Sequence, residues 1–165
     1  MPDPSSNQKP NNKKPIDGID SKMISLLQKD GRISNIDMAK QLGISEATVR
    51  ARMKRLMDEG FIQIVAVSNP FRLGFEITGD LYIHVEMKKA NDVIKELKKI
   101  KALWYIVMTT GDNNINAEFV VKTLEDLNDL VYNRVSHIDG VIRVETSVIM
   151  KYVKRNYAFG TALDE

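Results

Sequence analysis

The segment that decides the fold of the N-terminal half is Ser34-Asn-Ile-Asp-Met-Ala-Lys-Gln-Leu-Gly-Ile-Ser-Glu-Ala-Thr-Val-Arg-Ala-Arg-Met-Lys-Arg-Leu56. Its apolar residues recur at helical spacing on both sides of Gly43, which predicts two helices joined by a tight turn with a positive φ at the glycine. Ser34 and Ser45 stand where helix N-caps are expected. The second helix carries Arg50, Arg52, Lys54 and Arg55. This pattern is typical of a helix-turn-helix whose second helix lies in the major groove of DNA.

The basic helix has two faces of different character. At about 100° per residue, Val49, Met53 and Leu56 form a buried stripe, and the opposite face is expected to be exposed. Arg52 lies on the flank of the stripe, where it either pairs with an acid of a neighbouring helix, the interpretation we favour, or touches a base. Ser45 and the helix N-terminus are placed to bind phosphate. The expected DNA contacts are Ser45, Thr48, Arg50, Lys54 and Arg55.

Sequence around this helix pair completes an expected DNA-binding domain over residues 16–62. A first helix is expected from Asp17 or Asp20 to Lys29, and Phe61 to Val67 alternates like a short strand, a plausible wing. Residues 63–75 then hold the rest of this strand and a linker. Residues 1–15 are polar and rich in Pro and Lys, which is typical of a disordered tail, either simply solvated or making phosphate contacts.

Composition and charge narrow the class of protein. Residues 1–75 hold 12 Lys and Arg against 8 Asp and Glu, whereas residues 76–165 hold 12 against 14, so the positive charge lies with the helix pair. The chain has no Cys, no apolar run of the roughly 20 residues that a membrane span needs and no signal-peptide pattern at residues 1–15. We therefore expect a cytoplasmic protein without disulfides.

Residues 76–155 predict a second domain with the element order β-α-β-β-α-β, a ferredoxin-like arrangement. Strands are expected around Leu81–Met87, Leu103–Thr109, Ile115–Lys122 and Val141–Tyr152, with helices near residues 93–100 and 123–135. The fold class is thus α+β with two domains, followed by a C-terminal tail at residues 156–165. Trp104 and Tyr105 are expected on opposite faces of the sheet, and both need shelter. An uncovered apolar sheet face predicts pairing with a second copy, hence a homodimer.

Several motifs resemble those of the Lrp/AsnC, or feast/famine, family of prokaryotic transcriptional regulators over roughly residues 16–155. They are Ile16-Asp-Gly-Ile-Asp-Ser-Lys-Met-Ile-Ser-Leu-Leu-Gln-Lys-Asp-Gly-Arg-Ile-Ser34, Ala47-Thr-Val-Arg-Ala-Arg-Met-Lys-Arg-Leu56 with Glu59-Gly-Phe-Ile62, and Gly140-Val-Ile-Arg-Val-Glu-Thr-Ser147. The resemblance implies an N-terminal helix-turn-helix domain and a C-terminal domain that dimerises and binds a small effector, commonly an amino acid. It also implies further assembly of dimers, frequently into octamers.

The same resemblance implies an effector site between subunits, near the loop that joins the second and third strands. Family members usually carry Gly-x-x-Asp there, whereas this chain has Asn114 in place of the acid. The charge-assisted bond to an effector's ammonium group is then lost, so the effector differs, or Asp112 substitutes, or the site is weak. The residues also suit an ordinary turn. The candidate effector residues are Gly111, Asp112, Asn113, Asn114, Thr146 and Ser147.

Three candidate functions are consistent with the sequence. We favour a sequence-specific transcriptional regulator that binds double-stranded DNA. An enzyme on the same scaffold, similar to sirohaem decarboxylases, would need a pocket with His and Arg for acidic side chains, and residues 76–165 offer only two His and three Arg. An architectural DNA-binding protein with little sequence preference is the third. No catalytic motif is present, and neither His84 nor His137 has a second ligand at metal-binding spacing, so neither enzyme activity nor a cofactor is expected.

Overall fold

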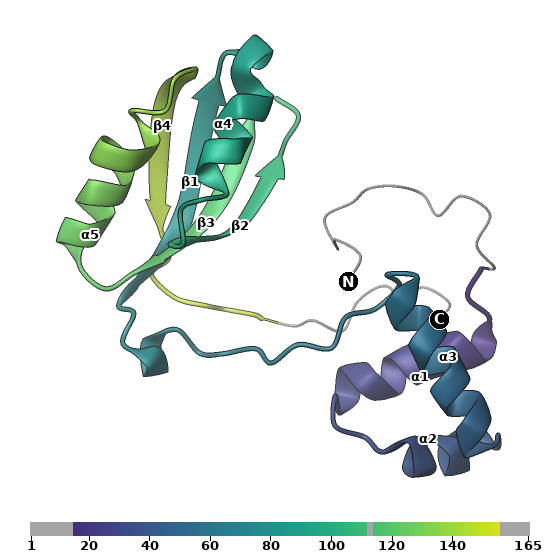
Figure 1. Ribbon diagram of the computed structural model, residues 1–165. Coiled ribbons are helices and arrows are strands. Elements are labelled where there is room, and N and C mark those ends of the chain that lie inside the picture. The colour runs from purple at the N-terminus through teal and green to yellow at the C-terminus, as the bar shows by residue number, and fades with distance from the viewer. Residues whose placement is uncertain (1–14, 112–113, 156–165) are drawn as a thin grey trace. The chain divides into compact units, whose positions relative to one another are not determined.

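The computed structural model describes residues 15–111 and 114–155. These residues divide into two compact units, the first comprising residues 15–66 and 154–155 and the second comprising the described part of residues 67–153. Figure 1 shows helices alone in the first unit and a sheet with helices in the second. Residues 1–14 of the expected N-terminal tail and the expected C-terminal tail, 156–165, lie outside the described residues. No helix in the described part of the chain is long and apolar enough to cross a membrane.

The first unit consists of α1 (Gly18–Lys29), α2 (Asn35–Leu42) and α3 (Glu46–Asp58). Each helix begins at a side chain that accepts a hydrogen bond from the first turn: Asp17 for α1, Ser34 for α2 and Ser45 for α3. Gly43 ends α2 at φ 66°, a conformation that glycine adopts without steric cost. The helix-turn-helix predicted from the sequence is therefore confirmed.

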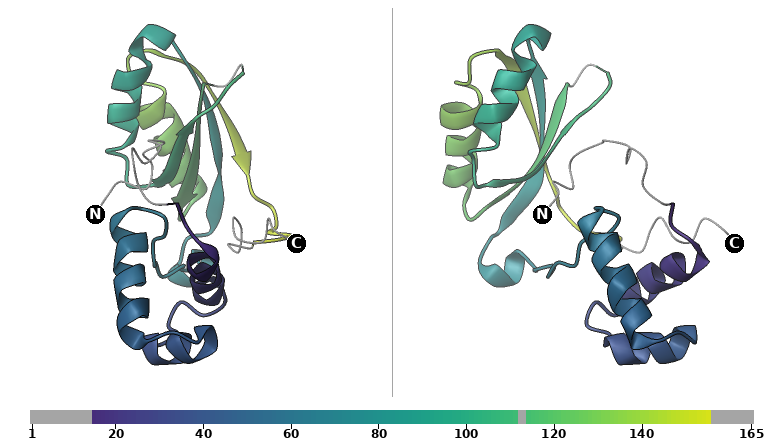
Figure 2. Two further views of the ribbon diagram at one scale, coloured as in Figure 1. Left: turned by 90° about the vertical axis from the view of Figure 1, so that its right-hand side faces the viewer. Right: turned by 45° about the vertical axis from the view of Figure 1, so that its right-hand side comes forward.

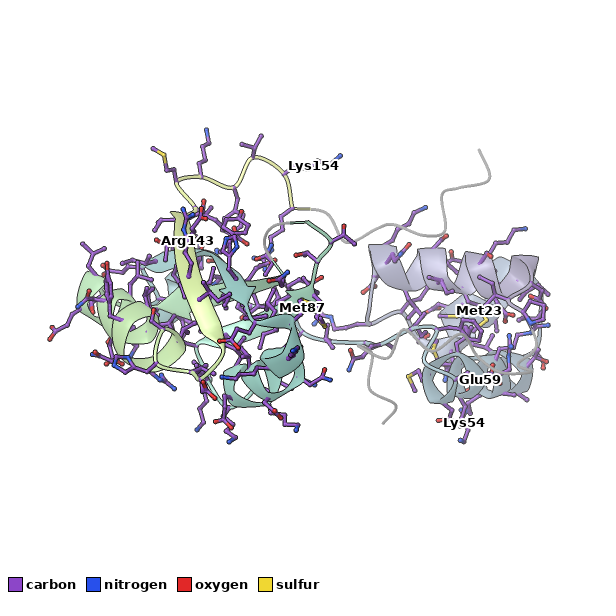
Figure 3. All side chains as sticks on the ribbon, turned by 90° about the horizontal axis from the view of Figure 1, so that it is seen from above. Met23, Lys54, Glu59, Met87, Arg143 and Lys154 are labelled. Carbon is purple, nitrogen blue, oxygen red and sulfur yellow. The ribbon has the colours of Figure 1, made fainter. Side chains whose placement is uncertain are left out.

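A small apolar core joins the three helices. Met23 of α1, Met38 and Ala39 of α2, and Val49 of α3 are buried against one another. Met23 lies between the helices in Figure 3, which views the molecule from above. The small side chain of Ala39 is buried in this cluster, at 8% exposure.

The predicted strand at Phe61 to Val67 is wrong. No residue between Asp58 and Phe71 belongs to a strand, and Ile64, Val65 and Val67 are exposed. Alternation of apolar residues fits a strand only where a second strand supplies hydrogen bonds, and the described residues offer this segment none. A short 3₁₀ turn, Phe71–Leu73, interrupts the linker before the second unit begins its sheet.

The second unit has the predicted order β1 (Ile77–Val85), α4 (Ala90–Leu97), β2 (Leu103–Met108), β3 (Ile115–Val121), α5 (Leu124–Asn128) and β4 (Val141–Val148). The strands form one antiparallel sheet in the order β2-β3-β1-β4. A π-helix, Asp129–Val135, continues α5. Both helices cover the same face of the sheet (Figure 2), so the ferredoxin-like fold class is confirmed.

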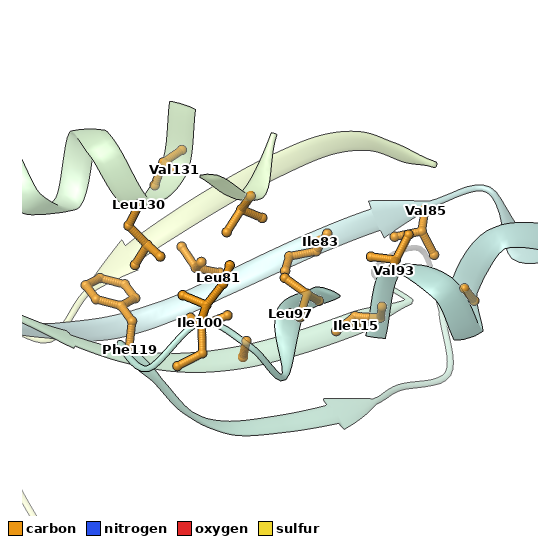
Figure 4. Packing of buried hydrophobic residues seen from close by; sticks show 14 of the residues in the cluster. Leu81, Ile83, Val85, Val93, Leu97, Ile100, Ile115, Phe119, Leu130 and Val131 are labelled. Carbon is orange, nitrogen blue, oxygen red and sulfur yellow. The ribbon is translucent and has the colours of Figure 1, made fainter. Parts of the chain in front are cut away.

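The core of the second unit lies between this sheet face and the helices. Alternate residues of the two central strands point into it, and Val93, Leu97 and Leu130 of the helices meet them (Figure 4). The strand residues that are fully buried there are Leu81, Ile83, Ile115, Ala117 and Phe119. Phe119 pairs with Gly79 across β3 and β1, and its ring occupies the space that a side chain at residue 79 would need.

Two details of the sheet differ from the sequence-based prediction. The last strand ends at Val148 instead of Tyr152. The register between β2 and β3 shifts between Leu103 and Tyr105, so Trp104 forms a bulge. The rings of Trp104 and Tyr105 consequently lie side by side with centroids 5.8 Å apart, and the expectation that they occupy opposite faces is wrong. Both remain exposed, at 55% and 46%.

Candidate DNA interface and effector site

The N-terminus of α3 is fixed by Ser45. Its hydroxyl oxygen accepts a hydrogen bond from the Thr48 backbone N–H at 3.1 Å and lies 2.8 Å from the Thr48 hydroxyl. Both side chains are exposed, because the cap points away from the apolar core of the unit. The first turn of α3 therefore offers solvent two hydroxyl groups beside the partly positive end of a helix.

Arg50 and Lys54 extend from the exposed face of α3. Their side chains are 71% and 76% exposed, and each pairs with an acid one turn away, Arg50 with Glu46 and Lys54 with Asp58. Lys54 points away from the body of the unit in Figure 3. A shallow hollow of about 550 Å³ follows this face and is lined by Glu46, Ala47, Arg50, Ala51 and Lys54. The charged side chains of Arg50 and Lys54 thus lie beside a surface formed by the small side chains of Ala47 and Ala51.

Arg52 and Arg55 lie on the other flank of α3 and point toward α1. Arg52 donates to the carboxylates of Asp17 at 2.7 Å and Asp20 at 2.8 Å, so the favoured interpretation of Arg52 is confirmed. Arg55, predicted to face outward, is only 22% exposed and donates to the fully buried Asp20. The outward placement of Arg55 is wrong, because an acid of α1 lies within its reach.

The remaining contacts of Arg55 also hold it against the unit. Its guanidinium lies 3.6 Å from Glu59 and 5.9 Å from the centroid of the Phe61 ring. Arg55 therefore braces the end of α3, whereas Arg50 and Lys54 leave their charge in solvent. The four basic residues of α3 divide into an outward pair and an inward pair.

Asp17 and Asp20 form an acidic pair that belongs to the fold. The pKa of Asp17 is lowered to about 2, first by the hydrogen bond from the Asp20 backbone N–H and then by the bond from Arg52. Burial works to raise the pKa of Asp20, but the Asp17 backbone N–H and Arg52 outweigh it and the pKa is lowered. The hydrogen bonds from Arg52 to the carboxylates of Asp17 and Asp20 raise the pKa of Arg52. Folding therefore favours the charged form of both acids.

The candidate effector residues that the structure describes fall into two groups at different positions along the strands. Asn114 directly precedes Ile115, which pairs with Ile83, whereas Thr146 and Ser147 pair with Leu81 and Asp80. Three to four residues of β1 therefore separate the two groups along the strand direction, roughly 10–13 Å. Asp112 and Asn113 lie outside the described residues. The structure does not bring Asn114 together with Thr146 and Ser147 within one chain.

Asn114 already has a structural task. Its side-chain oxygen accepts a hydrogen bond from the Val85 backbone N–H at 3.1 Å, which ties the β2–β3 loop to the end of β1. Gly111 of the same loop has φ 107° and is exposed. The amide nitrogen of Asn114 is a donor, whereas an aspartate there would offer a second acceptor. With asparagine at position 114, the loop offers an effector one more hydrogen-bond donor and one fewer acceptor than a loop with the usual aspartate.

Neither histidine contributes to a cluster of ligands. His84 Nε2 lies 3.3 Å from a carboxylate oxygen of Glu145, and His137 Nδ1 lies 2.6 Å from the carbonyl oxygen of Tyr132. Within residues 15–111 and 114–155, no group of three or more His, Cys, Asp or Glu side chains is placed to hold a metal ion. A second surface hollow, of about 350 Å³ and beside α5, contains no candidate effector residue in its lining.

Sequence reasoning missed three acids that pair with the basic side chains of α3: Asp17 and Asp20, which hold the inward arginines, and Glu46, which pairs with Arg50. Position on the helix gave a signal for Arg55, because Arg52 and Arg55 are three residues apart and share a flank. Glu46 and Arg50 are four residues apart and share the other flank. The distant acids carry no such local signal.

Two family profiles match the chain, one on either side of the boundary between its two units. Residues 16–63 match the winged helix-turn-helix DNA-binding profile, and residues 80–159 match the Lrp/AsnC ligand binding domain. An uncharacterized HTH-type transcriptional regulator of Pyrococcus horikoshii is 35% identical over 144 residues, covering 87% of this chain and 91% of that protein. The HTH-type transcriptional regulator FL11 of Pyrococcus furiosus is 34% identical, covering 84% of this chain and 92% of its own.

Solved structures share the fold of both units at lower sequence identity. The AsnC structure from E. coli aligns with a TM-score of 0.79 at 21% identity, covering 87% of this chain and 97% of that one. A transcriptional regulator from Neisseria meningitidis, solved as a complex with L-Met, aligns with a TM-score of 0.82 at 18% identity and covers 90% and 98%. The helix-turn-helix and the four-stranded domain thus occur together in known regulators.

Proposed function

Because the chain belongs to the Lrp/AsnC family of DNA-binding transcriptional regulators, we propose that it binds its operator through Ser45, Thr48, Arg50 and Lys54 of α3. The observation that carries this assignment is the outward projection of Arg50 and Lys54 beside an exposed helix N-terminus. Arg50 has the geometry to donate to a guanine edge, and Lys54 to a phosphate. Arg55 is left out of the interface because Asp20 holds it. A protein with this target works in the cytoplasm, where the chromosome lies.

We further propose that the protein acts as a homodimer formed through residues 76–155, with higher assembly such as an octamer. Trp104 and Tyr105 form an exposed aromatic pair, and the sheet face opposite α4 and α5 carries no helix in the described part of the chain. Two copies would present two recognition helices to successive major grooves, so the operator is expected to be roughly palindromic. Sedimentation of the purified protein tests this assembly, and a monomer at micromolar concentration would contradict it.

An amino-acid-type effector bound between C-terminal domains completes the proposal. The separation of Asn114 from Thr146 and Ser147 supports a site shared by two copies, since one chain does not bring them together. The Neisseria meningitidis relative with L-Met supports the chemical class. A thermal-shift screen of the 20 common amino acids tests it, because a ligand that binds the native state raises the melting temperature. If no amino acid raises the melting temperature at millimolar concentration, the proposal of an amino-acid effector is contradicted.

Competition with random DNA tests the regulator itself. The duplex that the protein enriches most strongly from a random pool is titrated in a gel-shift assay against excess random duplex. A sequence-specific regulator prefers its site by roughly 10³-fold or more. Equal competition by the two DNAs would instead identify an architectural DNA-binding protein.

A further inference from the structure

Glu46 stands on the DNA-facing side of α3 in contact with Arg50. It is the first residue of the helix, and its side chain is 40% exposed. An acid in this position is repelled by the negative charge of the phosphates of any bound duplex, so it weakens DNA binding in general. Such a cost is reasonable where the acid increases selectivity, because specificity depends on rejecting wrong sites as well as on binding the right one.

The Glu46–Arg50 pair presents donors and an acceptor side by side. The guanidinium nitrogens of Arg50 donate, and the carboxylate oxygens of Glu46 accept. In the major groove a G·C pair presents the N7 and O6 acceptors of guanine next to the N4 amine donor of cytosine. The exposed pair on α3 is the complement of that edge. An A·T pair would place the O4 acceptor of thymine against the carboxylate instead.

The surroundings of the pair allow a base edge to approach it. Ala47 and Ala51 floor the hollow beside Glu46 and Arg50, and neither extends beyond Cβ. The helix backbone can therefore come close to the floor of the groove. Glu46 lies in the first turn of α3, and residues near the start of a recognition helix are the ones that contact base edges.

We propose that Glu46 is a specificity-determining residue that, together with Arg50, reads a single G·C pair in each half-site. Arg50 donates to guanine, and Glu46 accepts from the cytosine amine while keeping its ion pair with Arg50. This inference rests on the proposed DNA interface and adds a residue and a base pair to it. Glu46 lowers the overall affinity for DNA and raises the discrimination against A·T at one position.

A matched pair of variants separates base reading from helix stabilisation. Asp58 pairs with Lys54 with the same four-residue spacing at the other end of α3, so Asp58→Ala serves as the control for Glu46→Ala. Circular dichroism confirms that both variants are folded. The full-length proteins then select binding sites from a pool of random duplexes. The wild-type protein and Asp58→Ala should select the same motif, with one G·C pair per half-site that Glu46→Ala and Arg50→Ala both fail to enrich.

Base analogues in that G·C pair identify the atoms. Replacing cytosine by 2-pyrimidinone, which lacks the amine, should weaken wild-type binding by about tenfold and leave Glu46→Ala unaffected. Replacing guanine by 7-deazaguanine should weaken the wild type and spare Arg50→Ala. Glu46→Ala should also bind random DNA several-fold more tightly than the wild type.

Two results would overturn the inference while leaving the proposed function intact: an unchanged motif for Glu46→Ala, or an equal effect of 2-pyrimidinone on Glu46→Ala and the wild type. The second result would mean that Glu46 only orients Arg50. A wild-type protein that selects no motif would instead contradict the sequence-specific regulator itself, and this inference with it.

Discussion

The guanidinium of Arg55 donates a hydrogen bond to the buried carboxylate of Asp20, which lies 35 residues earlier in the chain. Arg52 donates to the other oxygen of the same carboxylate, and the Asp17 backbone N–H donates to the oxygen that Arg55 contacts. Asp20 therefore joins the start of α1 to the flank of α3. Asp20 thus fixes α3 through the flank that faces α1, while Arg50 and Lys54 extend into solvent from the exposed face of α3.

We expect Asp20→Ala to lower the free energy of unfolding of the N-terminal unit by about 2–4 kcal/mol, because it leaves two inward arginines without their shared partner. Urea unfolding followed by circular dichroism measures the change. Asp58→Ala, which breaks only an exposed pair, should cost less than about 1 kcal/mol. Equal effects of the two substitutions would show that Asp20 does not hold α1 to α3.

Acid should destabilise the N-terminal unit through Asp17 and Asp20. The pKa of Asp17 is about 2 in the folded chain, and that of Asp20 is also lowered, whereas an unfolded chain titrates near its ordinary value of about 3.9. The unfolded state thus binds more protons, and the stability from both acids is complete above the ordinary pKa and lost as pH falls toward 2. Urea unfolding between pH 6 and pH 2 measures this loss.

Asp17→Asn supplies the control for the acid titration. The variant keeps an acceptor at the N-cap but has no carboxylate to protonate, so its stability should fall less steeply with acid than that of the wild type. Identical pH profiles for the two proteins would show that the lowered pKa of Asp17 does not contribute to folding.

Gly79→Ala should disrupt the sheet of the C-terminal unit. A Cβ at this position would lie 2.1 Å from the Ser147 carbonyl oxygen and 2.9 Å from the Phe119 ring, so β4 or Phe119 must move. Gly31→Ala, where the nearest atom is 3.8 Å away, is the matched control and should change stability little. Thermal unfolding and the soluble yield of both variants measure the difference. A Gly79→Ala protein as stable as the control would mean that the β1–β4 pairing tolerates the extra methyl group.

Local residue types were sufficient to predict the helix-turn-helix from sequence. Ser34, Gly43 and Ser45 mark helix ends through bonds within a few residues, and the structure places caps and the turn there. Arg55 was assigned to the wrong face because its partner, Asp20, is close only after the three helices pack. The alternation at Phe61 to Val67 gave no strand, since a strand also requires a neighbour that the pattern does not supply.

In the second unit, too, features that depend on one element were predicted, and features that depend on contacts between elements were not. Apolar periodicity predicted the order of its strands and helices, because each element buries its own alternate residues. The bulge at Trp104 was missed, since a register shift depends on how β2 meets β3 and not on β2 alone. The effector residues were predicted from family motifs, and the register shows that Asn114 and Ser147 lie about four residues of β1 apart along the strand direction.

Lys54→Ala should weaken binding to all DNA sequences alike and reduce the salt dependence of binding by about one phosphate contact. Its ammonium is exposed and has a point-like charge, which suits a phosphate better than a base edge. Gel-shift titrations from 50 to 200 mM salt give the slope of log affinity against log salt. A slope equal to that of the wild type would place Lys54 outside the interface.

The operator affinity of Arg50→Ala, compared with that of Arg55→Ala, tests the proposed DNA interface most directly when the folded fraction of each sample is known from circular dichroism. Arg50 extends into solvent and Arg55 is held by Asp20, so the two substitutions should act on different properties. Arg50→Ala should weaken operator binding by about 1–3 kcal/mol with unchanged stability, while Arg55→Ala should lower stability and leave the affinity of the folded protein near that of the wild type. Wild-type affinity for Arg50→Ala, together with weakened binding by folded Arg55→Ala, would contradict the division of α3 into a DNA-binding pair and a bracing pair.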